Sequence, residues 1–267
     1  MIHPSEISKL AHQLGLGDRT IEKDYVLTWV LFAMANSPLS EGLAFKGGTA
    51  IKKIYVPEYR FSEDLDFTVL DERFTNEALQ TAIEALFPWL KRETNLTFAT
   101  RKVEVHASGN PGFYLNYIGP LQGDLTSRFL KVDFTRDENL VFPLQKKLII
   151  APYTDCQSTN AMLLIYSLEE ILAEKLRSLL TRTEPRDLFD VHYIFANHMA
   201  DVERMAFYMG PKFDAKGFKV SELRTILARR KSTFDQLWKM RLKGQMPEIP
   251  QLETMIRETN RFIQQYF

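Results

Sequence analysis

Residues 45–70 read FKGGTAIKKIYVPEYRFSEDLDFTVL, and this stretch decides the fold. The apolar residues 43–45 predict a short strand that runs into a turn at Gly47 and Gly48. Residues 50–55 predict one or two helical turns, which Pro57 ends. Residues 65–70 predict a second strand. Glycines between a strand and a helix let backbone N–H groups approach an anion, so the turn is a candidate phosphate seat.

The second strand carries two aspartates on one face. Successive strand residues point to opposite faces, so Asp64 and Asp66 lie together while Leu65 and Phe67 lie on the other side. Two neighbouring carboxylates repel each other unless a cation lies between them, and Mg²⁺ is commonly held by such oxygen ligands together with substrate phosphates. The alternative is an exposed strand end with two solvated aspartates, which the D-x-D pattern by itself favours.

A third aspartate occurs in the strand-like stretch RFLKVDFTR. Val132 and Phe134 share one face there, and Lys131 shares the other with Asp133. A third carboxylate in the same half of the chain is what a two-metal phosphoryl-transfer site requires. A half-exposed structural strand alternates in the same way.

The segment SLEEILAEKLRSLL predicts an amphipathic helix with a lysine out of place. At helical spacing Lys175 falls at the centre of the stripe formed by the leucines and the isoleucine, while Glu170 and Arg177 fall on the far side. A long stem that crosses the core with its ammonium in a cleft suits a phosphate contact. The competing interpretation is a snorkelling lysine at the edge of the core.

The next helix opens with TEPRDLFD, in which Thr183 is a candidate cap and Pro185 suits the first turn. Asp187 fits an ordinary first-turn acid near the positive end of the helix dipole. Asp190 lies one turn further in, beside Val191, which makes it harder to explain as a solvated side chain.

The remaining pattern predicts an α+β front half and a helical back half. Helices are expected at residues 5–14, 20–35 and 75–90, and Thr20 is a candidate N-cap of the second. Strands are expected at 96–106, 113–118, 128–134 and 147–150. From Ser167 the pattern is helical almost to the end. The expected domains are therefore a core lobe of residues 1–160 and a helical lobe of residues 161–267.

Composition excludes several classes of protein. The 267 residues are 45% hydrophobic and 25% charged, which is ordinary for a globular chain. No stretch approaches the roughly 18 apolar residues of a membrane span, no secretory signal is visible, and Cys156 is the single cysteine. These features predict a cytoplasmic protein without membrane contact. Net charge is zero, but residues 212–243 hold ten Lys/Arg against three acids, which indicates either a polyanion-binding segment or a solvated helix face.

Four motifs together resemble a known family. GGTAIKKIYVPEYRFSEDLDF is similar to the first motif of the AbiEii/AbiGii-type nucleotidyltransferase toxins of type IV toxin–antitoxin systems, a family that includes MenT-like toxins. KVDF, EEILAEKLRSLLTR and RDLFDVHYI resemble its second, third and fourth motifs, and IEKDYVLTWVL resembles the stretch before the first. The similarity covers residues 20 to about 195 in the family's order, and residues 200–267 match nothing.

The resemblance implies a nucleotidyltransferase-like mixed sheet with flanking helices and a helical C-terminal lobe that completes the active site. It implies that Asp64, Asp66 and Asp133 hold metal. The expected catalytic residues are these three together with Lys175, Asp187 and Asp190. The expected nucleotide-binding residues are Lys46, Gly47, Gly48, Thr49, Arg60, Ser62, Lys131 and Lys175.

The activity that the resemblance implies is transfer of a nucleoside monophosphate from a nucleoside triphosphate to tRNA, with pyrophosphate release and inhibition of translation. The implied cofactor is Mg²⁺ or Mn²⁺, and the implied partners are the triphosphate, a tRNA acceptor bound through residues 212–243, and a cognate antitoxin. Two alternatives remain: a nucleotidyltransferase that modifies a protein or a small molecule, and a module that binds a nucleotide or RNA without turnover.

Overall fold

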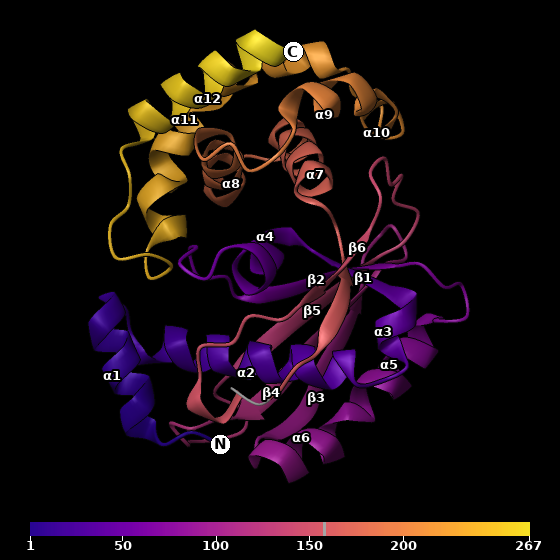
Figure 1. Ribbon diagram of the computed structural model, residues 1–267, viewed down its shortest axis with the longest axis vertical. Helices are drawn as coiled ribbons and strands as arrows, with labels where there is room; N and C mark the ends of the chain where they lie inside the picture. The colour runs from indigo at the N-terminus through magenta and orange to yellow at the C-terminus, as the bar shows by residue number, and fades with distance from the viewer. Residues whose placement is uncertain (157–158) are drawn as a thin grey trace. The chain divides into compact units, whose positions relative to one another are not determined.

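A computed structural model describes residues 1–156 and 159–267, shown in Figure 1. The chain divides into two compact units. The first comprises Met1–Glu138 and Leu144–Ile165, and the second comprises Asn139–Pro143 and Tyr166–Phe267.

A seven-stranded mixed sheet forms the centre of the first unit, in the order β3-β4-β5-β2-β1-β7-β6. Two neighbouring pairs, β1 with β7 and β2 with β5, are parallel, and the others are antiparallel. This sheet with its helices is the α+β architecture that the sequence predicts. The strands are β1 (Leu43–Lys46), β2 (Asp64–Val69), β3 (Thr97–Val105), β4 (Pro111–Ile118), β5 (Phe129–Thr135), β6 (Gln145–Leu148) and β7 (Met162–Ile165). All but β7 were expected within a few residues.

The helices of the first unit are α1 (Pro4–Leu14), α2 (Asp18–Ala35), α3 (Leu39–Gly42), α4 (Gly47–Ala50), the π-helix η1 (Ile51–Tyr55), α5 (Asn76–Glu84), α6 (Leu86–Thr94) and the 3₁₀ turn η2 (Thr154–Cys156). Two sequence predictions are wrong in detail. Thr20 is not an N-cap, because α2 already begins at Asp18 after Gly17. The single helix expected at 75–90 is two helices, since Pro88 in the first turn of α6 has no N–H to continue the bonding from α5.

A line of phenylalanines on one face fixes the register of the central strands. Phe67 of β2 lies with its ring centroid 5.0 Å from that of Phe45 on β1 and 5.9 Å from that of Phe134 on β5. Phe113 of β4 meets Phe134 edge-on at 5.5 Å. All four side chains are buried. Because strand residues alternate in direction, burying these rings turns the aspartates of β2 and β5 to the opposite face.

The second unit is helical, as expected from Ser167 onward. Its elements are α7 (Leu168–Thr181), α8 (Pro185–Ala196), α9 (Val202–Tyr208), α10 (Gly210–Asp214), the 3₁₀ turn η3 (Val220–Glu222), α11 (Leu223–Leu242) and α12 (Leu252–Tyr266). Thr183 does not cap α8: Glu184 occupies the N-cap position, and the Thr183 hydroxyl accepts a bond from Arg230 at 3.2 Å. Within the described residues, no helix is long and apolar enough to span a bilayer.

Candidate active site

The pairing of β2 with β5 brings the predicted carboxylates together. In this parallel pair Asp66 is the register partner of Asp133, and Asp64 is the partner of Lys131. Register partners on neighbouring strands lie about 5 Å apart, so Asp66 and Asp133 stand side by side. Two strands far apart in sequence thus present one polar face, as the alternation predicted.

The glycine turn lies directly against this face. Gly47 has φ +82°, a conformation that side-chain-bearing residues rarely adopt, and a Cβ atom there would stand 2.6 Å from Oδ2 of Asp66. The hydroxyl of Thr49 donates to the backbone carbonyl of Asp64 at 2.5 Å. Thr49 therefore uses its side chain to fix the turn to β2, and any phosphate contact it makes must come from its backbone N–H.

Asp133 has two carboxylate oxygens in different environments. Oδ2 accepts from Lys131 Nζ at 2.7 Å. Oδ1 is buried and accepts no hydrogen bond within the described residues, although His106 Nε2 lies 3.7 Å away. Gly112 makes room for this oxygen, since a Cβ there would come within 2.6 Å of it. Burial lowers the pKa of Lys131, but its bond to Asp133 and the charges of Asp133 and Asp64 outweigh burial, and the pKa is raised overall.

The donor set fits a divalent cation. Among the described residues, no three His, Cys, Asp or Glu side chains form a ready metal-binding group, and the Lys131 ammonium lies against Asp133. The chemistry is nevertheless that of a hard-cation site: carboxylates share one face on paired strands, and a buried oxygen of Asp133 accepts no hydrogen bond there. Asp64, Asp66 and Asp133 are the residues that would hold the ion.

Buried cationic side chains donate hydrogen bonds to backbone carbonyls of the segment that leads into β2. Lys52 Nζ donates to the carbonyls of Pro57 and Tyr59, both at 2.9 Å, and lies 3.8 Å from the Phe61 ring centroid. Lys46 and Arg60, both predicted to bind nucleotide, are buried, with Arg60 Nη1 donating to Phe61 O at 3.2 Å. Ser62 is half-buried.

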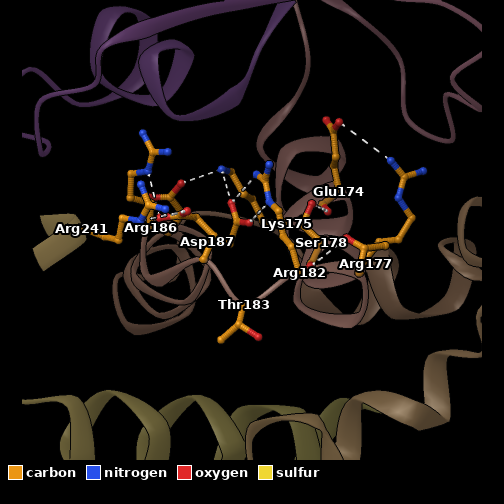
Figure 2. A network of polar contacts seen from close by, with 12 residues as sticks. Glu174, Lys175, Arg177, Ser178, Arg182, Thr183, Arg186, Asp187 and Arg241 are labelled. Carbon is orange, nitrogen blue, oxygen red and sulfur yellow. Dashed lines mark hydrogen bonds and ion pairs between the residues drawn. The ribbon is translucent and has the colours of Figure 1, made fainter. Parts of the chain in front are cut away.

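The other predicted residues, Lys175, Asp187 and Asp190, form a cluster within the helical unit, and Figure 2 shows Lys175 and Asp187. Lys175 Nζ lies 2.7 Å from Asp187 Oδ1 and 2.9 Å from Asp190 Oδ2. Arg182 Nε donates to the other oxygen of Asp187 at 2.7 Å. Burial raises the pKa of Asp187, but the charges of Lys175 and Arg182 outweigh burial and hold it at about 2. The central position predicted for Lys175 is explained by these two buried carboxylates, and its phosphate contact stays a prediction.

Two expectations about exposed charge are wrong. Glu170 and Arg177 were placed on the side of α7 away from its apolar stripe, yet both are buried. Lys212, counted in the basic segment, is also buried, and its Nζ pairs with Glu170 at 2.7 Å. The helix is covered on more than one side, so a single apolar stripe underestimates its buried surface.

The sequence pattern missed two polar residues: His106, whose Nε2 lies 3.7 Å from Asp133 Oδ1, and Lys52, which donates to carbonyls of the segment before β2. A bulge between Thr100 and Lys102 shifts the register of β3, so alternation read from its first residues assigns the later ones to the wrong face. Lys52 sits in a π-helix, where α-helical spacing does not apply. In the sequence, the signal for Lys52 is a lysine that stands shortly before the loop containing Pro57.

Comparisons with known proteins identify the family and the fold of this chain. The family model described as nucleotidyl transferase AbiEii toxin, Type IV TA system, matches residues 29–262. None of the curated proteins matches the chain. Among solved structures, MenT4, a nucleotidyltransferase toxin from Mycobacterium tuberculosis H37Rv, superposes with a TM-score of 0.70 at 17% identity, covering 99% of this chain and 90% of that one. A candidate nucleotidyltransferase from H. pylori gives 0.60 at 18% identity, covering 94% and 96%.

At these identities the solved structures establish the fold, while the family match extends over most of the chain. The glycine turn and the paired carboxylates are thus found in a chain with the fold of nucleotidyltransferase toxins. This protein belongs to the AbiEii nucleotidyltransferase toxin family of type IV toxin–antitoxin systems.

Proposed function

We propose that this protein transfers a nucleoside monophosphate from a nucleoside triphosphate to a hydroxyl of an RNA, with tRNA as the acceptor. The observation that carries the proposal is the contact of Gly47 with Asp66, whose register partner is Asp133. A phosphate seat and a pair of acidic side chains are thereby fixed to each other by backbone geometry. The MenT4 toxin of the same fold is itself a nucleotidyltransferase.

The reaction is a displacement at the α-phosphorus. The acceptor oxygen forms a bond to that phosphorus, the bond to the bridging oxygen of the β-phosphate breaks, and pyrophosphate leaves. The acceptor proton passes to the carboxylate of Asp133, the candidate general base. A bound Mg²⁺ or Mn²⁺ supplies positive charge that neutralises the phosphate oxygens. Backbone N–H groups of the glycine turn bind the triphosphate, and the carboxylates and Lys131 orient the reacting groups.

The direct test supplies each α-labelled nucleoside triphosphate in magnesium with total deacylated tRNA. Wild type is expected to label RNA and release pyrophosphate, while Asp66→Ala does neither and keeps its melting temperature. Asp124→Ala, at an exposed position of the loop between β4 and β5 where, among the described residues, the carboxylate accepts only from Thr126, is the control that retains transfer. Intact transfer by Asp66→Ala would rule out the assigned site.

Incubation of the labelled nucleotides with a whole-cell extract separates the remaining activities. If protein or a small molecule is labelled and RNA is not, then the acceptor is that molecule and not RNA. Absence of pyrophosphate release would leave a nucleotide-binding module without turnover. In cells, transfer to tRNA is expected to stop translation, and a cognate antitoxin is expected to restore growth.

A further inference from the structure

The polar face that carries the carboxylates continues across the sheet to two neighbouring aromatic rings. Tyr114 of β4 is the register partner of Lys131, and Phe129 lies on β5 two residues before Lys131. Their ring centroids are 5.6 Å apart. We call Tyr114 and Phe129 the aromatic platform. Phe129 is 38% exposed, so the platform is open to a ligand.

Cations surround the aromatic platform. Lys102 Nζ lies 4.2 Å from the Tyr114 centroid, and Arg101 Cζ lies 5.1 Å from that of Phe129. Lys131 and Lys23 lie 5.5 Å and 5.7 Å from the same two rings. A single exposed phenylalanine is ordinary. Aromatic rings interleaved with several cations are typical of surfaces that bind single-stranded nucleic acid, in which bases stack on the rings and phosphates pair with the cations.

The acidic groups nearby leave part of this positive charge uncompensated. Glu104 pairs with Lys102 at 3.3 Å, and Glu63 lies 3.8 Å from Lys23. Arg101 forms no ion pair with any described residue, and its exposed guanidinium is available to a phosphate.

The order of the strands indicates whether the platform binds the donor triphosphate or the acceptor RNA. The glycine turn follows β1, the carboxylates lie on β2 and β5, and the platform lies on β5 and β4, in a sheet ordered β4-β5-β2-β1. The carboxylates thus lie between the triphosphate seat and the platform. In phosphoryl transfer the attacking and leaving oxygens stand roughly in line on opposite sides of the phosphorus. If pyrophosphate leaves toward the glycine turn, the nucleophile arrives from the β4 side.

We propose that Tyr114 and Phe129, with Arg101 and Lys102, bind the bases and phosphates of the acceptor RNA next to its reacting hydroxyl. Phe129 is four residues from Asp133, about 13 Å along an extended strand. A single-stranded RNA end with its hydroxyl at Asp133 therefore runs over both rings within a few nucleotides. This assignment rests on the proposed function.

The test separates binding of the acceptor from binding of the donor. Affinity for a short fluorescein-labelled single-stranded RNA is measured by anisotropy without nucleotide, and KM values for tRNA and for the triphosphate are measured in the transfer assay. Phe129→Ala is expected to weaken RNA binding and raise the tRNA KM by roughly tenfold, the size of one lost base stack, with the triphosphate KM unchanged. Phe129→Trp keeps a ring and retains affinity.

Two further variants control for packing and charge. Leu148→Ala removes a side chain that is 52% exposed on β6, at the opposite edge of the sheet, and should change nothing. Arg101→Gln should weaken RNA binding and reduce the slope of log Kd against log salt by about 1.

The outcomes are distinct. A raised triphosphate KM with unchanged RNA affinity in Phe129→Ala would assign the rings to the donor base and overturn the proposal. Unchanged affinities, or a wild type that does not bind the RNA, would also overturn it. Wild type that binds the RNA through Phe129 but transfers no nucleotide would support the platform and contradict the proposed function instead.

Discussion

Lys175 joins two buried carboxylates of the helical unit through one ammonium group. The side chains of Asp187 and Asp190 are 1% and 0% exposed, and each lies within 3 Å of Lys175 Nζ. Water does not replace the lysine at such depth, so loss of its charge leaves the carboxylates to repel each other. Removing one partner of a buried ion pair typically costs about 3–5 kcal/mol.

We expect Lys175→Met to lower the free energy of unfolding by about that amount and to abolish nucleotide transfer. Urea unfolding and the labelled-nucleotide assay measure the two effects. The triple variant Lys175→Met/Asp187→Asn/Asp190→Asn removes the repulsion and should recover much of the stability without recovering transfer. Transfer by the refolded triple variant would reduce this cluster to a structural role.

Lys52 is a buried lysine whose ammonium is bound by two carbonyls. Burial lowers its pKa to about 8 from the ordinary 10.5, against the opposing charge of Asp24. Between these two values the unfolded chain holds the proton more tightly than the native protein does. The free energy of unfolding therefore rises with pH across this window through Lys52, by about 1 kcal/mol for each pH unit.

We expect the difference in unfolding free energy between wild type and Lys52→Met to shift in favour of wild type as pH rises from 8 to 10. Urea titrations at a series of pH values measure it, and taking the difference cancels other titrating groups. Lys52→Arg keeps its charge throughout and should lack the rise. Parallel curves for wild type and Lys52→Met would contradict the lowered pKa.

At the scale of elements, the sequence predicts the strands that carry the aspartates better than the elements around them. Alternation on β2 and β5 places their aspartates on one face, and strand pairing then brings them together. The bulge in β3 and the π-helix at Ile51–Tyr55 break the periods on which such reading depends, so His106 and Lys52 were missed. β7 was missed because its sequence, MLLI, is a continuous apolar run shortly before α7, and periodicity does not distinguish such a run from a buried helix segment.

Gly47 connects the turn to the carboxylates. An alanine there combines two effects: strain at φ +82°, about 1 kcal/mol, and a Cβ placed 2.6 Å from Asp66 Oδ2. We expect Gly47→Ala to reduce transfer by at least roughly tenfold, because displacing a positioned catalytic group by an ångström costs more than that.

Comparison with Gly217→Ala isolates the second effect, the contact with Asp66. Gly217 has φ +76°, and no atom lies within 4 Å of the position that a Cβ atom would occupy there. Its alanine variant therefore carries the strain without the clash. Both variants should lose stability in thermal melts because they share the backbone strain, and only Gly47→Ala should lose activity. Equal activities in the two variants would show that the contact with Asp66 does not matter.

At the scale of the whole molecule, the chain passes between the units at Glu138, Pro143 and Ile165. The sequence places a single boundary near residue 160, and no local pattern shows that the short segment Asn139–Pro143, which lies between β5 and β6, belongs to the helical unit. The reason is a long-range contact. Glu170 Oε2 accepts from the N–H groups of Val141 and Phe142 at 2.9 Å and 2.8 Å, and periodicity along a helix carries no information about such a partner.

The fully buried pair of Glu170 and Lys212 holds this segment. Lys212 Nζ lies 2.7 Å from Glu170 Oε1 and donates to Asn139 O at 3.3 Å. Lys212→Met leaves Glu170 as an unpaired buried charge, so a loss of about 3–5 kcal/mol in unfolding free energy is expected. In Glu170→Gln/Lys212→Met, no net charge remains at the site, and much of that loss should be recovered.

Amide hydrogen exchange shows whether the pair fixes the segment or only stabilises the helices. In the double variant the glutamine carbonyl can still accept from Val141 and Phe142, whereas in Glu170→Ala/Lys212→Met nothing replaces it. Exchange at these two amides should therefore accelerate in the alanine double variant relative to the glutamine one. The amide of Val132 in β5 serves as an internal reference, since its strand belongs to the other unit. Equal exchange at Val141 and Phe142 in both variants would mean that the segment is held without Glu170, and the pair would then serve only the helices.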